Sequence, residues 1–417
     1  MKFAGILFLA AAVAFNAAAA PETNKQQTPV KKNIPAKKNA KKRLPHKRKI
    51  PASVNLSQYS PDAKNATAAF VRAVKSGARK IVFDKAMTYY LEPVSLRSNL
   101  TVEVCPGAKI QAVSGVTYSA PKDKKSRPLP GLFNGIRVAR VNINFQDDTT
   151  VTGLPDRPVF YFYSSNAINV RNGEITGGGI GAELENCYSV RFQRTIFDRL
   201  KAGLISSSGS WNTLTDVQFR NISGGGVSII SDRFGHLPYF TLDNCEFFNS
   251  VSGLLLQRKK KIDPMPQPKK NAKARHMRLN IRNCRFFNNS GVDATLNGTL
   301  YKGTVFIENC LFANSKNSSL QLNDFAALPP QIDVQIINTG FTPKDRNAAA
   351  PIVVTTTTEL PLGNIKIKNS DVKNPVHIPA VKFALKKNAG KIDGELPVIS
   401  ADGNRKYTKL TLTQEKN

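Results

Sequence analysis

The sequence of 417 residues is poor in the residue types that build metal sites and disulfide frameworks. It holds five Cys and four His, and none of them stands in a Cys-x-x-Cys or His-x-x-x-His spacing. This argues against a zinc or iron–sulfur site, and an odd number of Cys argues against a disulfide framework. After the first twenty residues, no apolar run is long enough for a membrane-spanning helix. We therefore expect no metal, no cofactor and no transmembrane segment in the mature chain.

Acidic residues are also scarce. Lys and Arg number 60 against 29 Asp and Glu, which gives a formal net charge of +31 and a pI of about 10.0. Hydrophobic residues make up 41% of the chain, enough for a core, so composition excludes a wholly disordered protein. An excess of cations favours anionic partners. Candidates are an acidic or sulfated glycan, a cell-envelope polymer and extracellular nucleic acid.

The first twenty residues have the pattern of a secretory signal peptide. Lys2 supplies the positive start, residues 6–15 the apolar stretch and residues 17–20 the small residues that precede a cleavage site. A short N-terminal anchor helix is the alternative, and the cleavage position stays open. The segment predicts a secreted protein, either extracellular or periplasmic.

Two stretches concentrate the positive charge. Residues 21–50 hold eleven Lys or Arg and one acid, and we interpret them as a disordered basic arm. Residues 258–278 hold nine Lys or Arg and one acid, and we interpret them as a basic loop insertion. Outside these two stretches 40 basic residues still face 27 acidic ones. The body of the protein is therefore basic as well.

An internal repeat begins near residue 170. Its pattern is apolar-x-Asn-small-x-aromatic, clearest in Leu242–Phe247, Ile281–Phe286 and Ile307–Phe312. The third positions of all copies follow at intervals of 22 to 39 residues: Asn172, Arg194, Asp216, Asn244, Asn283, Asn309, Asn338 and Asn369. A repeat of this length with variable insertions indicates a solenoid.

Alternation on both sides of each anchor residue predicts the shape of one coil. Apolar residues at spacings of two, before and after a polar corner, indicate two short strands that meet at a bend. A third apolar segment follows, such as Gly253–Leu256. We therefore predict an all-β fold, a right-handed parallel β-helix with three short strands per coil. It spans residues 55–375, with a capping helix at 61–76, and residues 376–417 form C-terminal strands or a cap and a tail.

Stacked coils bring equivalent residues to about 4.8 Å from each other. We expect the anchor Asn residues to form a ladder in which each amide bonds its neighbour and the corner backbone. The Phe residues of the repeat would fill the core. Cys245, Cys284 and Cys310 fall in one inward column, where we expect buried free thiols that act as small hydrophobic residues.

The N-terminal part of this region carries a family resemblance. The stretches 62–74, 78–83, 88–91, 98–102 and 106–110, followed by the Asn-Cys-x-Phe coils, resemble the pectin-lyase-like β-helix superfamily. The resemblance implies the β-helix fold over about residues 55–375. It implies no single activity, because the fold hosts hydrolases, lyases, esterases, tailspikes and adhesins. Residues 244–257 and 283–286 also resemble, more weakly, coils of β-helix α-1,3-galactosidases.

Insertions after the third strand of successive coils predict a wall along one edge of the solenoid. Four aromatic residues lie near this edge, and their rings could stack on sugars: Trp211, Tyr188, Tyr239 and Tyr301. Packing of loops onto the coils is the alternative explanation. Gln257, in the segment that resembles the galactosidases, and the cations Arg233 and Arg258 complete the candidate substrate-binding residues.

Four ionisable residues are the candidates for catalysis: Glu183, Glu185, Asp232 and His236. Because Glu183 and Glu185 are two apart on one strand, their side chains share a face and could act as the acid and base of a glycosidase. For a lyase, His236 would be the base and Arg233 and Arg258 would neutralise a uronate. Solvated surface carboxylates are the alternative. Asp147–Asp148 and Asp293 are further candidates.

The leading hypothesis is a secreted β-helix protein that binds and cleaves a polysaccharide or glycan, as a hydrolase rather than a lyase. Two of the four motifs of polygalacturonase-type hydrolases, Asn-Thr-Asp and Arg-Ile-Lys, are absent, and the Arg-x-Pro-x-x-Arg pattern of pectate lyases is absent from the predicted coils. The alternative is therefore a non-catalytic surface or matrix protein that binds anionic polymers. Nucleic acid ranks third as a partner, and the oligomeric state stays open.

Overall fold

The computed structural model describes residues 51–62, 64–115, 129–231, 239–258, 277–297, 303–323, 332–342, 350–355, 365–373, 381–384, 392–399 and 405–409. The predicted signal peptide and the basic arm at 21–50 lie outside these residues. Within the described residues, no helix is long and apolar enough to cross a membrane.

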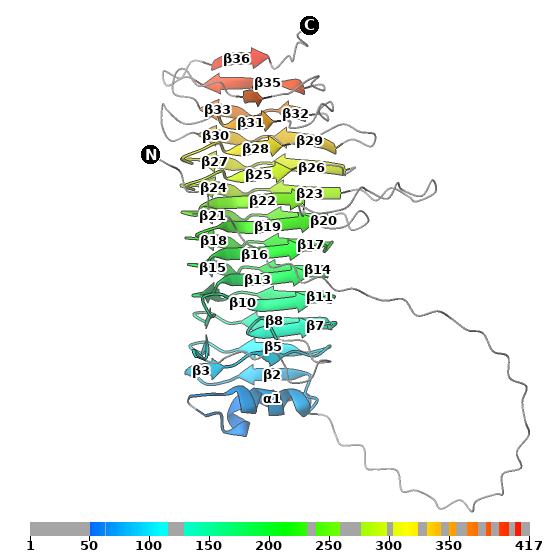
Figure 1. Cartoon of the computed structure of the whole chain (residues 1–417), viewed down its shortest axis with the longest axis vertical. Coiled ribbons are helices and arrows are strands. Elements are labelled where there is room, and N and C mark those ends of the chain that lie inside the picture. Colours follow the sequence, from blue (N-terminus) through cyan, green and yellow to red (C-terminus); the bar gives the residue numbers. More distant parts are fainter. Residues whose placement is uncertain are drawn as a thin grey trace, which may run out of the picture. The chain divides into compact units, whose positions relative to one another are not determined.

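Strands of three parallel sheets alternate along the chain, and each coil adds one strand to each sheet (Figure 1). Sheet A contains β1 (Ser53–Asn55), β2 (Lys80–Phe83), β5 (Thr101–Val104), β8 (Ala139–Phe145), β11 (Asn166–Arg171), β14 (Tyr188–Gln193), β17 (Asn212–Thr215), β20 (Tyr239–Asp243), β23 (Met277–Arg282), β26 (Gly303–Glu308), β29 (Ile332–Ile337) and β32 (Ile365–Lys368). Sheet B contains β3 (Thr88–Leu91), β6 (Lys109–Ala112), β9 (Thr150–Thr152), β12 (Glu174–Thr176), β15 (Ile196–Asp198), β18 (Gln218–Arg220), β21 (Glu246–Phe248), β24 (Arg285–Phe287), β27 (Leu311–Ala313), β30 (Gly340–Thr342) and β33 (Asp371–Lys373). Sheet C contains β4 (Val94–Ser95), β7 (Phe133–Ile136), β10 (Pro158–Tyr163), β13 (Ile180–Glu185), β16 (Ala202–Ser207), β19 (Gly225–Ser231), β22 (Ser252–Arg258), β25 (Ala294–Asn297), β28 (Leu320–Asn323), β31 (Ile352–Thr355) and β34 (Val381–Ala384). The predicted parallel β-helix with three strands per coil is confirmed.

The anchor residues of the repeat form the corner between sheets A and B. All eight of them have positive φ, between 47° and 59°. Asn and Asp tolerate this left-handed conformation better than other non-glycine residues, because their short side chains bond locally. A single left-handed residue turns the chain from one strand into the next, so the predicted bend lies where the repeat placed it.

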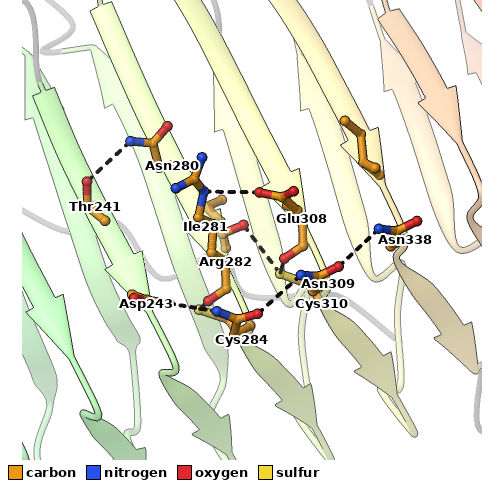
Figure 2. Close-up of polar contacts among 12 residues, drawn as sticks. Thr241, Asp243, Asn280, Ile281, Arg282, Cys284, Glu308, Asn309, Cys310 and Asn338 are labelled. Carbon is orange, nitrogen blue, oxygen red and sulfur yellow. Dashed lines mark hydrogen bonds and ion pairs between the residues drawn. The ribbon is translucent and has the colours of Figure 1, made fainter.

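The polar ladder along this corner is mixed in composition (Figure 2). Asn338 Nδ2 donates to Asn309 Oδ1 over 3.2 Å, and Asn309 Nδ2 donates to Asn283 Oδ1 over 3.4 Å. In earlier coils carboxylates accept instead, as where Asn283 Nδ2 donates to Asp243 Oδ1 over 2.9 Å. The predicted Asn-to-Asn ladder is therefore correct only in part. Neighbouring coils are still joined, because a carboxylate accepts the same hydrogen bond.

Inside the coils, equivalent side chains stack as expected. The rings of Phe197, Phe219, Phe247, Phe286, Phe312 and Phe341 lie 4.6 to 5.1 Å apart, with interplanar angles of 3° to 6°. Cys245, Cys284 and Cys310 are buried free thiols. Burial raises the pKa of Cys284 well above its ordinary value, so this thiol stays protonated and unreactive. The core is thus a set of columns parallel to the axis.

The first coil is preceded by η1 (Leu56–Tyr59) and α1 (Thr67–Lys75). The predicted helix at 61–76 was right in kind but began too early. Asp62 Oδ1 accepts the Lys64 N–H, and Asn65 Oδ1 accepts the Thr67 N–H over 3.0 Å, so both side chains bond backbone N–H groups ahead of the helix or at its first residue. One face of the helix packs on the core, with Phe70 fully buried.

Two predicted boundaries also need correction. The basic loop was placed at 258–278, but β22 ends at Arg258 and β23 begins at Met277, so the connecting segment is 259–276. The solenoid was predicted to end at residue 375. However, β34 pairs in parallel with β31, and β35 (Ile392–Ile399) pairs in parallel with β32. Coil pairing therefore continues beyond 375, and β36 (Arg405–Lys409) then pairs antiparallel with β35.

Candidate functional site

Strand β13 presents two carboxylates on the outer face of sheet C. Ala182 and Leu184 are buried in the core, and the alternation of side chains turns Glu183 and Glu185 outward. The prediction that the two Glu residues share a face is therefore confirmed. Glu183 is half-buried and Glu185 is exposed.

Strands on either side of β13 decide what surrounds this pair. Glu183 pairs in register with Tyr161 of β10 and with Ile205 of β16. Tyr163 lies beside Glu185 in the same way. A Tyr ring on one side and an Ile side chain on the other thus shield Glu183 from water, while Glu185 lies at the end of its strand.

The two carboxyl groups have different environments. Burial, and to a lesser extent the charge of Glu185, raises the pKa of Glu183 above its ordinary value. Glu185 Oε2 accepts a hydrogen bond from the Tyr161 hydroxyl over 3.0 Å. No hydrogen bond or ion pair of the Glu183 side chain occurs within the described part of the chain. The pair thus combines a carboxyl that holds its proton to higher pH with a carboxylate held by a phenol, which is the arrangement that acid–base chemistry needs.

The candidate aromatic residues lie on another face. Trp211 and Tyr239 stack at the edge of sheet A, with ring centroids 4.2 Å apart. Tyr188 does not join this column, because it pairs with Ser210 and so lies one position out of register with Trp211. The outer faces of sheets A and C are separated by a corner of the coil. Trp211 thus lies at the corner before β17, and no hydrogen bond or ring contact of the described residues joins it to Glu183 or Glu185.

The other predicted site residues lie either on strand β22 of sheet C or outside the described residues. Gln257 is on the outer face of sheet C in the column of Glu185, but three strands further along, roughly 14 Å away at the usual strand spacing. Arg258 ends β22 and pairs in register with Ser231. The remaining candidates lie outside the described residues: Asp232, Arg233, His236 and Tyr301.

Three further carboxylate candidates lie in other parts of the coils. Asp147 and Asp148 are exposed at the corner between β8 and β9, where Asp148 has a φ of 60°. Asp293 is fully buried inside the coil, where Asn289 Nδ2 and Ser315 Oγ donate to its two oxygens. Asp147 and Asp148 follow the corner pattern of the repeat, and Asp293 belongs to the core. None of the three is part of the carboxylate pair on β13.

Sequence reasoning missed Tyr161 and Tyr163. Both precede the Glu residues by 22 residues, which is the shortest interval of the repeat. This interval would have placed them beside the pair, but the repeat was recognised only from residue 170 onward. No group of three or more His, Cys, Asp or Glu that could hold a metal ion occurs among the described residues.

Comparisons with known proteins agree with this architecture. Residues 158–341 match the family model described as the right handed beta helix region. The sequence itself matches no curated protein.

Among solved structures, the A-module of mannuronan C-5 epimerase AlgE6 from Azotobacter vinelandii is similar, with a TM-score of 0.61 and 11% identity over 83% of this chain and 94% of that one. The AlgE4 A-module from the same organism has a TM-score of 0.58 and 12% identity over 83% and 96%. An exopolygalacturonase from Thermotoga maritima has a TM-score of 0.47 and 12% identity over 86% and 94%. At such low identity the likeness to the two epimerase modules concerns the fold alone. The chain therefore has the fold of a right-handed parallel β-helix, and residues 158–341 match the family model of that region.

Proposed function

We propose that this protein is secreted and that it binds and hydrolyses a polysaccharide or glycan at the outer face of sheet C. The observation that carries the proposal is the unlike pair on β13, where burial raises the pKa of Glu183 and Tyr161 bonds Glu185. Two carboxyl groups with different environments are what most glycoside hydrolases use. Residues 1–20 support export, since they have the pattern of a signal peptide.

In this proposal Glu183 is the general acid. Its carboxyl gives a proton to the glycosidic oxygen as the bond from that oxygen to the anomeric carbon breaks. Glu185, as carboxylate, stabilises the positive charge that develops on the sugar and takes a proton from the attacking water. Tyr161 is a positioning residue, because its hydroxyl fixes the Glu185 carboxylate.

Hydrolysis is favoured over elimination by the surroundings of the pair. A lyase acting on a uronate needs cations that neutralise the substrate carboxylate, as well as a base. The outward positions of β10, β13, β16 and β19 up to residue 230 carry Tyr161, Tyr163, Glu183, Glu185, Ile205, Ser207, Ser228 and Ile230. None of these is Lys or Arg.

An assay of the purified full chain on neutral, uronate and sulfated glycans tests the proposal. We expect one substrate class to yield reducing ends, and Glu183→Gln and Glu185→Gln each to lower kcat at least about 100-fold. Glu174→Gln, which removes a carboxylate from sheet B, is the matched control and should keep full activity. The rate of the wild-type protein should fall as pH rises through the raised pKa of Glu183, because the acid then loses its proton. Product formation that survives Glu183→Gln unchanged would contradict the assignment.

A second candidate function is non-catalytic binding of anionic polymers. The net charge of +31, much of it outside the two basic stretches, favours it. If a well-folded preparation gives no product on any glycan but binds heparin, this function replaces hydrolysis. Binding that survives deletion of residues 21–50 and 259–276 would locate the polymer on the coils. Binding lost with these segments would assign it to them.

A further inference from the structure

We propose that Trp211, Ser189 and Arg191 form a second binding site, on the outer face of sheet A, for a sugar unit that carries a carboxylate or a sulfate. This site is separate from the Glu183–Glu185 pair and does not depend on it. It would hold a glycan without cutting it.

Trp211 is placed in an unusual way for a large apolar residue. Its side chain is 58% exposed, the highest value among the exposed large hydrophobic residues of the described chain. Its backbone has a φ of 61°, in the left-handed region that bulky residues avoid. Earlier coils fill the same corner position with Arg140, Ala167 and Ser189, at φ of 52° to 56°. Because other coils also have a left-handed residue at this corner, the exposure of the indole ring is what sets Trp211 apart, and an exposed aromatic ring can stack on a sugar.

One face of the indole is covered. The Tyr239 ring stacks on Trp211 at 4.2 Å with an interplanar angle of 15°. The Arg278 guanidinium then lies 5.9 Å from the Tyr239 ring centroid and 5.5 Å from that of Phe306. Arg278 Nε also donates to Asn280 Oδ1 over 3.2 Å, and Figure 2 shows Asn280 bonding Thr241 in turn. These contacts hold the column in place from Trp211 toward the later coils.

The opposite face of the indole is turned toward small residues. Strand pairing places Ser189 directly before Trp211 in the column, and Ala167 before Ser189. Each coil occupies about 4.8 Å along the axis, close to the thickness of a sugar ring stacked on an aromatic one. A pyranose over Ser189 would therefore continue the column, in a layer where the chain itself carries only a small side chain.

The charge around this layer is positive. Arg191 is two residues after Ser189, on the same face of β14, and so lies in the same layer. Arg191 is exposed, and its side chain makes no ion pair with any described residue. The outward neighbours of Arg191 on the adjoining strands, Asn169 and Thr213, are uncharged, and the acid Asp243 lies two strands further along. A negative group on the sugar ring would meet Arg191 in its own layer.

The chain provides its own reporter for this site. Trp211 is its only tryptophan, so fluorescence excited at tryptophan reports this ring alone. The full chain is titrated with three probes: an oligogalacturonate, a heparin oligosaccharide and a neutral cello-oligosaccharide. We expect a saturable change with at least one anionic probe, weakened by added salt, and a response at least about tenfold weaker with the neutral one. The two anionic arms decide between carboxylate and sulfate.

Variants separate this site from the rest of the surface. Arg191→Gln should weaken anionic binding about tenfold and leave the tryptophan signal available. Lys109→Gln, which removes an exposed cation from sheet B, is its matched control and should change nothing. Trp211→Ala, followed by calorimetry, should abolish binding, whereas Leu311→Ala, at another exposed apolar residue, should not. Glu183→Gln should bind like the wild type, because the carboxylate pair lies on another face.

Three results would overturn the proposal: no saturable fluorescence change with either anionic probe, equal affinity for the neutral probe, or anionic affinity unchanged by Arg191→Gln. Loss of glycan cleavage with this binding intact would reject the proposed hydrolysis only. Cleavage with no binding at Trp211 would reject the second site only.

Discussion

Asp293 shows how a single residue gains its properties from stacking. It is fully buried, and burial raises its pKa to about 7, against which the hydrogen bonds from Ser315 and Asn289 act only in part. A carboxyl group whose pKa is raised on folding stabilises the folded state only while it is protonated. Its favourable contribution is complete below about pH 4 and is lost as pH rises through 7.

Asp293→Asn should therefore change the pH dependence of stability. An Asn side chain keeps an oxygen that can accept from the Asn289 amide, and it carries no charge at any pH. The variant should therefore not lose folding stability at this position as the pH rises. The free energy of unfolding of the variant relative to the wild type should rise by up to about 4 kcal/mol between pH 4 and 8, from three pKa units at about 1.4 kcal/mol each. Urea unfolding at a series of pH values measures it. Asp147→Asn, at an exposed residue, is the control, and parallel curves for Asp293→Asn and wild type would contradict the prediction.

Glycines at the start of some sheet C strands leave space for the Phe rings of sheet B. Gly203 of β16 and Gly226 of β19 lie beside Phe219 and Phe247 of the sheet B strands that follow them in the chain. A Cβ on Gly203 would collide with the Gly226 carbonyl oxygen and with the Phe219 ring. The stacked Phe column and the glycines at the start of the sheet C strands therefore form one packing unit.

Gly203→Ala should destabilise the protein by about 1–3 kcal/mol, because a close-packed interior with backbone on one side cannot make room for the methyl group. Gly225→Ala is a matched control in the next coil, since its Cβ would meet only the Ser228 hydroxyl, at 3.2 Å. Chemical unfolding of both variants measures the difference. Equal stability of the two would show that the Phe column can shift to accommodate the group.

The whole solenoid depends on closure of its first coil. Helix α1 covers this end, where Phe70 is fully buried 5.8 Å from the Phe83 ring and 6.2 Å from the Phe133 ring. An uncovered end would expose apolar side chains and unpaired strand edges, which favour association.

Phe70→Ala should lower the free energy of unfolding by about 3–5 kcal/mol and increase self-association, since it leaves a cavity beneath the cap. Arg72→Ala, on the exposed side of the same helix, should change stability by less than about 0.5 kcal/mol. Denaturant unfolding and light scattering measure the two effects. A stable monomeric Phe70→Ala protein would mean that the helix is not needed as a cap.

Much of the fold could be read from the sequence because its determinants are local. A left-handed corner needs Asn, Asp or another tolerant residue at one position, and strands on either side need alternating apolar residues. Both requirements recur in every coil, so the anchors from Asn172 to Asn369, the Phe column and the buried Cys residues were all predicted correctly. The start of α1 was placed too early because Asp62 is a residue type that caps helices, whereas in the structure the N-cap is Ala66 and no side chain caps it.

The candidate sites depended on the tertiary structure. Sequence spacing placed Glu183 and Glu185 on one face, but the unlike character of the pair comes from Tyr161 and Ile205 in neighbouring coils. Trp211 was predicted at the edge that follows the third strands, but its stack on Tyr239 depends on the register between coils. Alternation and corner preference act within one coil and are written in the local sequence, whereas burial, charge and stacking at a surface position arise only when the register between coils is set.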